Sequence, residues 1–169
     1  MAMECKEFHP YPYQQFCIQH IIDHPAAGLF VDMGMGKTVM TLTAFNYLKY
    51  YAWQIQRCLV IAPKKVAEAT WRTEISGWQH LRHLRCSEVL GTATQRRAAM
   101  AVDADVYVTN RDNVQWLVKE YGKAWPFDMV VLDESSSFKN HQAKRFKALR
   151  AMRPKIKRIV ELTGTPSPH

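Results

Sequence analysis

The feature that most constrains this chain is a glycine-containing segment between an apolar run and a helical stretch. The run Leu29-Phe30-Val31 has the composition of a short buried strand, and residues 32–38 (Asp-Met-Gly-Met-Gly-Lys-Thr) follow it directly. Residues 39–44 then continue as the first turns of a helix. A strand that turns through glycines into a helix directs backbone N–H groups inward, at the positive end of the helix dipole. The segment therefore predicts a strand–loop–helix unit that binds phosphate groups.

This context is the one that a Walker A loop requires. The residues expected to surround a nucleotide's phosphates are Met33, Gly34, Met35, Gly36, Lys37 and Thr38. Lys37 is expected to reach the β- and γ-phosphates, and the Thr38 hydroxyl to ligate Mg²⁺. The common pattern GxxxxGK[ST] has glycine at its first position, where this chain has Val31. The half of the pattern that cradles the phosphates is intact.

A second polar feature lies at the end of another apolar run, where residues 129–132 lead into Asp133 and Glu134. Ligands of parallel sheets bind at the carboxyl ends of the strands, so this pair predicts a Walker B arrangement. Asp133 is expected to hold Mg²⁺ opposite Thr38, and Glu134 to orient and deprotonate the attacking water. The catalytic set is thus Lys37, Asp133 and Glu134. An Asp-Glu pair is common by itself, and the upstream phosphate loop makes it informative.

Apolar runs alternate with helix-period stretches along the whole chain. Strands are expected at 29–31, 59–62, 106–108, 129–132 and 159–162, with a weaker one at 88–90; helices are expected at about 12–22, 37–50, 66–78, 93–101, 111–121 and 142–152. The alternation, and strands that are apolar throughout, predict an α/β fold with a mainly parallel sheet and helices on both faces. Without repeats or a Gly/Ser linker, residues 1–169 are expected to form one domain.

The amino-acid composition indicates which classes of binding partner to expect. Lys and Arg number 23 against 15 Asp and Glu, a net charge of +8 that favours nucleic acid, although a basic domain can serve solubility alone. Much of the excess comes from residues 139–158, which lack Asp and Glu. They predict a solvated helix face, with an auxiliary DNA contact or an interface with a second lobe as the alternative. The four cysteines form no CxxC pair, so reduced thiols in a cytoplasmic protein are expected. No run of 18 apolar residues predicts a membrane span.

Taken in order, the motifs resemble those of superfamily 2 helicases and translocases, most closely the SWI/SNF type. The matching blocks are Tyr13-Gln14, residues 32–38 (motif I), residues 59–64 (motif Ia), Asp133-Glu134-Ser135-Ser136 (DExx box), residues 138–140 and residues 162–166 (motif III). They extend from about residue 8 to residue 166. The resemblance implies a RecA-like fold, the first of the two lobes that such motors use. One departure is Ser135-Ser136, where the family often has Ala-His.

The resemblance also implies roles for single residues. Gln14 is expected to select adenine through its carboxamide, which can both donate and accept hydrogen bonds. The residues expected to contact nucleic acid or to couple it to the nucleotide are Pro63, Lys64, Thr109, Asn110, Arg111, Thr163 and Thr165. The loops among them follow strand ends and suit contacts to phosphates that do not distinguish bases. Solvated loops, and for the threonines a strand-ending turn, are the alternative interpretation.

The leading hypothesis is therefore the ATP-binding lobe of a DNA-dependent ATPase or translocase, located in the cytoplasm or on the nucleoid. It would use ATP and Mg²⁺ and act on double-stranded DNA without sequence preference. Motifs IV to VI and the arginine fingers of a second lobe are not in this sequence, so slow hydrolysis is expected from the chain alone. Two alternatives stay open: a non-enzymatic nucleic-acid-binding or regulatory module on the same scaffold, and the motor part of a restriction-type enzyme.

Overall fold

The computed structural model describes residues 5–31, 35–134 and 143–164. Within these ranges six strands form one sheet in the order β1-β6-β5-β2-β4-β3, and every neighbouring pair is parallel. The strands are β1 (Ala26–Phe30), β2 (Cys58–Ala62), β3 (Cys86–Glu88), β4 (Val106–Asn110), β5 (Met129–Asp133) and β6 (Arg158–Thr163). The predicted α/β fold with a parallel sheet is confirmed.

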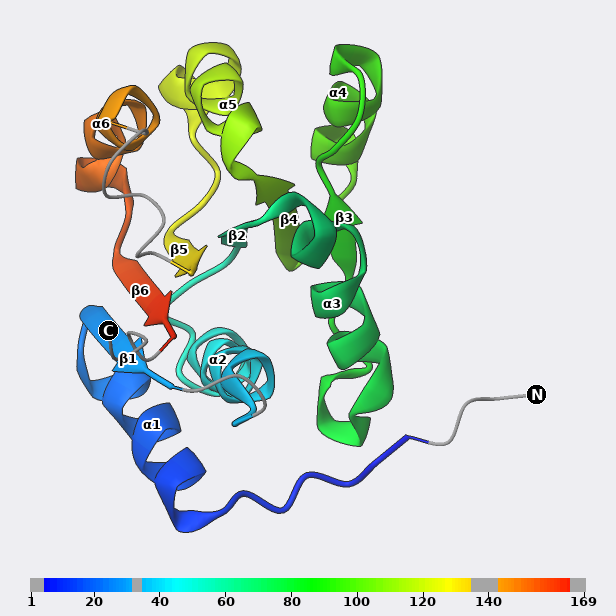
Figure 1. Cartoon of the computed structure of the whole chain (residues 1–169), viewed down its shortest axis with the longest axis vertical. Helices are drawn as coiled ribbons and strands as arrows, with labels where there is room; N and C mark the ends of the chain where they lie inside the picture. The colour runs from blue at the N-terminus through cyan, green and yellow to red at the C-terminus, as the bar shows by residue number, and fades with distance from the viewer. Residues whose placement is uncertain (1–4, 32–34, 135–142, 165–169) are drawn as a thin grey trace, which may run out of the picture.

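Helices cover both faces of the sheet. They are α1 (Pro12–Asp23), α2 (Lys37–Asn46), α3 (Lys64–Gly77), α4 (Ala93–Ala101), α5 (Val114–Tyr121) and α6 (Ala143–Ala151). Figure 1 shows α1, α2 and α3 on one side of the strands and α4, α5 and α6 on the other. Among the described helices, none is both long and apolar enough to cross a bilayer.

Two hydrophobic cores follow from this layering. Successive side chains of a strand point to opposite faces, and in β2 Val60 packs into the core under α2 and α3 while Leu59 packs into the core under α5. Strands buried on both faces must be apolar throughout, and every residue of β5 is buried. Asp133, the last residue of β5, therefore lies at the carboxyl edge of the sheet, after four buried apolar residues.

β1 and β3 form the two edges of the sheet. β1 pairs with β6, the last of the described strands, with Ala26 beside Ile159 and Phe30 beside Thr163. Its residues alternate between exposed and buried, with Ala27 and Leu29 turned into the core. The strand that leads to the phosphate loop thus lies at the edge of the sheet and pairs with β6 alone among the described strands.

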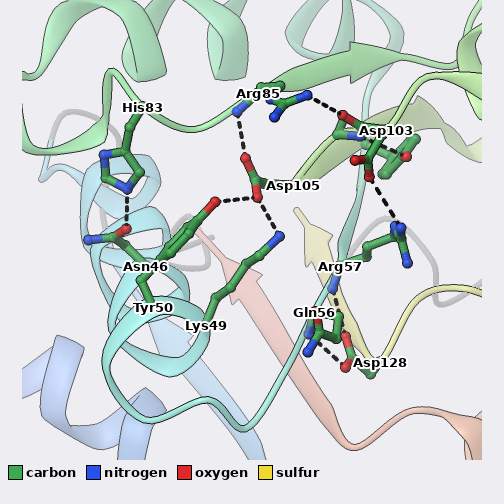
Figure 2. A network of polar contacts seen from close by, with 12 residues as sticks. Asn46, Lys49, Tyr50, Gln56, Arg57, His83, Arg85, Asp103, Asp105 and Asp128 are labelled. Carbon is green, nitrogen blue, oxygen red and sulfur yellow. Dashed lines mark hydrogen bonds and ion pairs between the residues drawn. The ribbon is translucent and has the colours of Figure 1, made fainter.

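Several element bounds differ from the prediction. β1 begins at Ala26, three residues before the expected strand, and the expected helix 111–121 opens with a 3₁₀ turn. The expected helix 37–50 is α-helical only to Asn46, and a single π-helical turn follows at Tyr47–Tyr51. This turn is anchored by tertiary contacts, because Lys49 and Tyr50 both donate to Asp105 (Figure 2). Sequence periodicity does not register such anchoring.

Candidate nucleotide-binding site

The start of α2 has the geometry expected of a phosphate loop. Gly36 is the N-cap of α2 and has φ of 82°, in the left-handed region that favours glycine. A Cβ at this position would lie 2.7 Å from Gln14 Nε2, so a larger residue would also force the end of the Gln14 side chain to move. Lys37 and Thr38 follow in the first turn of the helix. Met33 and Gly34, which were also expected to bind phosphate, lie outside the described residues.

The phosphate loop and the acidic pair meet at the carboxyl edge of the sheet. Lys37 Nζ lies 2.9 Å from Asp133 Oδ1 and 3.8 Å from Glu134 Oε1. Asp133 is completely buried, whereas the Glu134 side chain is partly exposed and its backbone has a positive φ of 59°. The two elements that are far apart in sequence thus bring a cation and two carboxylates into contact. This arrangement can bind a phosphate chain and a divalent cation together.

Asp133 has a second partner, from α3, that the sequence did not predict. The indole Nε1 of Trp71 donates to Asp133 Oδ2 at 3.1 Å, and Trp71 is fully buried. Seven residues, two helical turns, separate Trp71 from Trp78, a spacing typical of packing. Trp71 does pack in the core, yet its one polar atom faces the acidic pair. No pattern in the sequence indicates this contact, because it depends on how α3 is rotated against the sheet.

A cavity of about 490 Å³ opens at this point, within the range of small-molecule sites. It is lined by Tyr11, Tyr13 and Gln14 near the start of α1, by Gly36, Lys37, Thr38 and Val39, by Val66, Thr70, Glu74 and Trp78 along and just beyond α3, and by Asp133 and Glu134. The predicted residues Gln14, Gly36, Lys37, Thr38, Asp133 and Glu134 therefore share one cavity. The wall formed by α3 was not predicted.

At the aromatic end of the cavity, hydrogen bonds connect the start of α1 to the segment before α2. Met35 O accepts from Tyr13 Oη at 2.9 Å and from Gln14 Nε2 at 3.3 Å. The other end of the Gln14 carboxamide accepts from the backbone N–H of Tyr11 at 2.9 Å. Gln14 and Tyr13 thus tie the start of α1 to the phosphate loop. Recognition of adenine by Gln14 stays a prediction.

The residues predicted for nucleic acid fall into two groups. Pro63 lies just after β2 and Lys64 begins α3, whereas Asn110 ends β4 and Arg111 begins a 3₁₀ turn; because Ala62 pairs with Asn110, the ends of the two strands lie side by side. Nε and Nη2 of the Arg111 guanidinium are buried. Thr109 instead belongs to β4 and is fully buried, and its hydroxyl donates to Val89 O at 2.7 Å. Its side chain is therefore committed to the interior.

Of the two threonines predicted to couple nucleotide and nucleic acid, the structure describes Thr163 and not Thr165. Thr163 ends β6, and its carbonyl accepts from the N–H of Val31, just past β1, at 3.1 Å. This bond connects the predicted motif III with the strand that leads into the phosphate loop. Thr165 lies outside the described residues, as do Ser135 and Ser136.

Comparisons with known proteins agree with this geometry. A sequence model of the SNF2-related domain matches residues 13–169. Protein p41 of Acyrthosiphon pisum secondary endosymbiont phage 1 is 40% identical over 170 residues, which cover 97% of this chain and 37% of p41. The SWI/SNF-related matrix-associated actin-dependent regulator of chromatin subfamily A-like protein 1 of Bos taurus is 29% identical over 136 residues, 80% of this chain and 13% of that protein.

Solved structures give the same result. The SWI2/SNF2 ATPase core of Sulfolobus solfataricus, solved in complex with dsDNA, matches with a TM-score of 0.76 and 27% identity over 98% of this chain and 34% of that one. The UvsW helicase of bacteriophage T4 shares the fold, with a TM-score of 0.72 and 18% identity over 94% of this chain and 53% of that chain. The chain therefore spans only part of the length of these relatives.

The match to the domain covers nearly the whole chain, and its phosphate loop, acidic pair and parallel sheet occur together in one described structure. The chain belongs to the SNF2-related family of helicase-type ATPases, in which it corresponds to the amino-terminal RecA-like lobe.

Proposed function

We propose that residues 1–169 act as one ATP-binding domain of a DNA-dependent ATPase and translocase, and that efficient hydrolysis requires a second RecA-like lobe. The observation that carries the proposal is the convergence of Lys37, Thr38, Asp133 and Glu134 on one cavity, with Gln14 at its other end. A structural scaffold has no need for a lysine held between two carboxylates beside an open cavity.

The donors in the cavity suit Mg²⁺. Magnesium prefers oxygen ligands, commonly one or two from the protein together with phosphate oxygens and water. The Thr38 hydroxyl and the Asp133 carboxylate line the same cavity and would hold the ion. Its chemical contribution would be to neutralise charge on the phosphate oxygens.

The remaining residues would position the reactants. Lys37 would bind the β- and γ-phosphates once it leaves Asp133, and the N–H groups at the start of α2 would add their partial positive charge. Glu134, which is partly exposed to the cavity, would orient a water molecule and accept its proton. Arginine fingers raise rates by roughly 10³- to 10⁵-fold in related enzymes, so we expect this chain alone to hydrolyse ATP slowly.

Double-stranded DNA is the proposed track. Three observations support it: the net charge of +8, the exposed Lys64 at the start of α3 beside the end of β4, and the dsDNA bound in the Sulfolobus solfataricus relative. Contacts from this edge of the sheet to phosphates would be independent of sequence, as movement along DNA requires. A cytoplasmic or nucleoid location would follow from that substrate.

Nucleotide titrations test the proposal. Lys37→Ala removes the charged group expected on the phosphates, so the variant should bind ATP with Mg²⁺ about 10- to 100-fold more weakly than the wild type. Lys119→Ala, in the exposed last turn of α5, is the matched control and should bind like the wild type. Circular dichroism at the titration temperature should show that all three proteins are folded. Equal ATP binding by Lys37→Ala would support the non-catalytic scaffold instead.

A further inference from the structure

We propose that Trp71 is a positioning residue for Asp133. Its indole N–H would hold the carboxylate in a fixed orientation, so that Oδ1 stays turned toward the nucleotide cavity when Lys37 leaves it. The inference rests on the proposed function, because it concerns how the site accepts Mg²⁺ together with ATP. It assigns a role in that site to a helix, α3, that the phosphate loop and the acidic pair do not include.

The two oxygens of Asp133 have partners of different kinds. Lys37 Nζ lies 2.9 Å from Oδ1, and Trp71 Nε1 lies 3.1 Å from Oδ2. Lysine has a flexible four-carbon stem, so its ammonium group can move to a phosphate without any change in the backbone. The indole ring of Trp71 is fully buried in the core, where packing fixes its position. Lys37 can therefore leave Asp133 for a phosphate while Trp71 keeps its hydrogen bond to Oδ2.

This difference matters because Asp133 is itself completely buried. A buried carboxylate that loses a partner retains the full cost of being removed from water. With Trp71 in place, Oδ2 remains hydrogen-bonded during the exchange and the carboxylate keeps its rotamer. Partners that orient a metal-binding carboxylate in this way typically change metal affinity by about 10- to 100-fold when they are removed.

A second tryptophan shows that burial alone does not bring a hydrogen bond. Trp125 is also buried, in the core on the opposite face of the sheet, and its indole Nε1 has no acceptor among the described residues. Trp71→Phe and Trp125→Phe therefore delete the same atoms from two buried sites. Only the first deletion removes a donor from Asp133, which makes Trp125→Phe a matched control.

The test compares ATP dissociation constants with saturating Mg²⁺ and with a chelator. In the wild type and in Trp125→Phe, Mg²⁺ should strengthen ATP binding by the same factor. In Trp71→Phe that factor should fall by about 10-fold or more, while metal-free ATP binding stays as in the wild type. If Trp71→Phe does not fold, the isosteric Trp71→3-benzothienylalanine, which replaces the N–H with sulfur, keeps the packing and should give the same loss.

Indole ¹H–¹⁵N resonances provide a readout that does not depend on nucleotide. Asp133→Asn should shift the Trp71 indole signal and leave that of Trp125 in place, and in the wild type the Trp71 N–H should stay protected from exchange when ATP and Mg²⁺ are added. The inference would be overturned if Asp133→Asn left the Trp71 indole signal unshifted, or if the Trp71 N–H exchanged rapidly with ATP and Mg²⁺ bound. It would also be overturned if Mg²⁺ strengthened ATP binding by Trp71→Phe as much as by the wild type. A wild type without any Mg²⁺-dependent ATP binding would instead contradict the proposed function.

Discussion

At the scale of the residue, Gly36 combines two requirements in one position. Its φ of 82° is costly for any residue with a Cβ, and a Cβ there would lie only 2.7 Å from Gln14 Nε2. The Gln14 carboxamide in turn holds the carbonyl of Met35. A side chain at position 36 would therefore displace the contact that joins α1 to the phosphate loop.

Gly36→Ala should lower the free energy of unfolding by about 1–3 kcal/mol, because alanine is strained at this φ. It should also weaken ATP binding, since Gln14 has to move. Gly77→Ala is the control: Gly77 ends α3, has no positive φ, and no atom lies within 4 Å of the added Cβ. Urea unfolding and ATP titration of both variants check the prediction. Equal effects of the two substitutions would contradict it.

The sequence identified the polar half of the site and missed the wall opposite it. Asp133 was predictable because it ends a strand, where parallel sheets place their ligands. Lys37 was predictable because it follows a strand and a glycine-containing segment and begins a helix. Trp71 and Glu74 were not, because a residue within a helix gains its neighbours from the rotation of that helix. Thr109 was expected in a loop, but β4 extends two residues further than its apolar run and takes the side chain inside.

At the scale of the element, Asp105 joins the start of β4 to two other segments. The Asp105 carboxylate accepts hydrogen bonds from Tyr50 Oη, at 2.7 Å, and from Lys49, both in the π-helical turn after α2. It also accepts one from the backbone N–H of Arg85, at 2.7 Å, in the segment before β3 (Figure 2). Burial disfavours the charged form of Asp105, but these hydrogen bonds outweigh it and lower its pKa. Burial and the bond to Asp105 raise the pKa of Tyr50 to about 12.

This lowered pKa gives stability a defined pH dependence. The unfolded Asp has a pKa near 3.8, so the contribution is fully present above that pH and is lost as the pH falls through the folded-state pKa. Asp105→Asn should cost about 2 kcal/mol at neutral pH, and the difference from the wild type should shrink in acid. Denaturant unfolding across pH measures this, with Asp103→Asn as the exposed control. A constant difference at all pH values would contradict the prediction.

At the scale of the whole molecule, the carboxyl edge of the sheet carries the nucleotide site and the proposed DNA loops together. Lys64→Ala should weaken binding to unrelated duplex sequences by similar factors and lower the slope of log affinity against log salt by about 1. Lys119→Ala, in the last turn of α5, should leave both unchanged. Fluorescence anisotropy at several salt concentrations provides the measurement. A loss confined to some sequences would argue against phosphate contact.

The alternation of apolar runs predicted the elements, their parallel pairing and the helices on both faces. It could not predict which strands are neighbours, because periodicity describes one segment at a time. The insertion of β6 between β1 and β5 is set by long-range pairing. The π-helical turn was missed for the same reason, since Asp105 lies far from it in sequence.

The edge position of β1 has a consequence for the order in which the protein is made. During synthesis β1 is made first of the described strands, whereas β6, the strand beside it, is made last of them. β2 and β5 can pair before that point, so Asp133 can take its place while the phosphate loop still has no anchored strand behind it. The strand that leads into the phosphate loop therefore gains its sheet partner only after β5 has been made. If the domain binds ATP as proposed, we expect a nascent chain to bind nucleotide only after Thr163 has emerged.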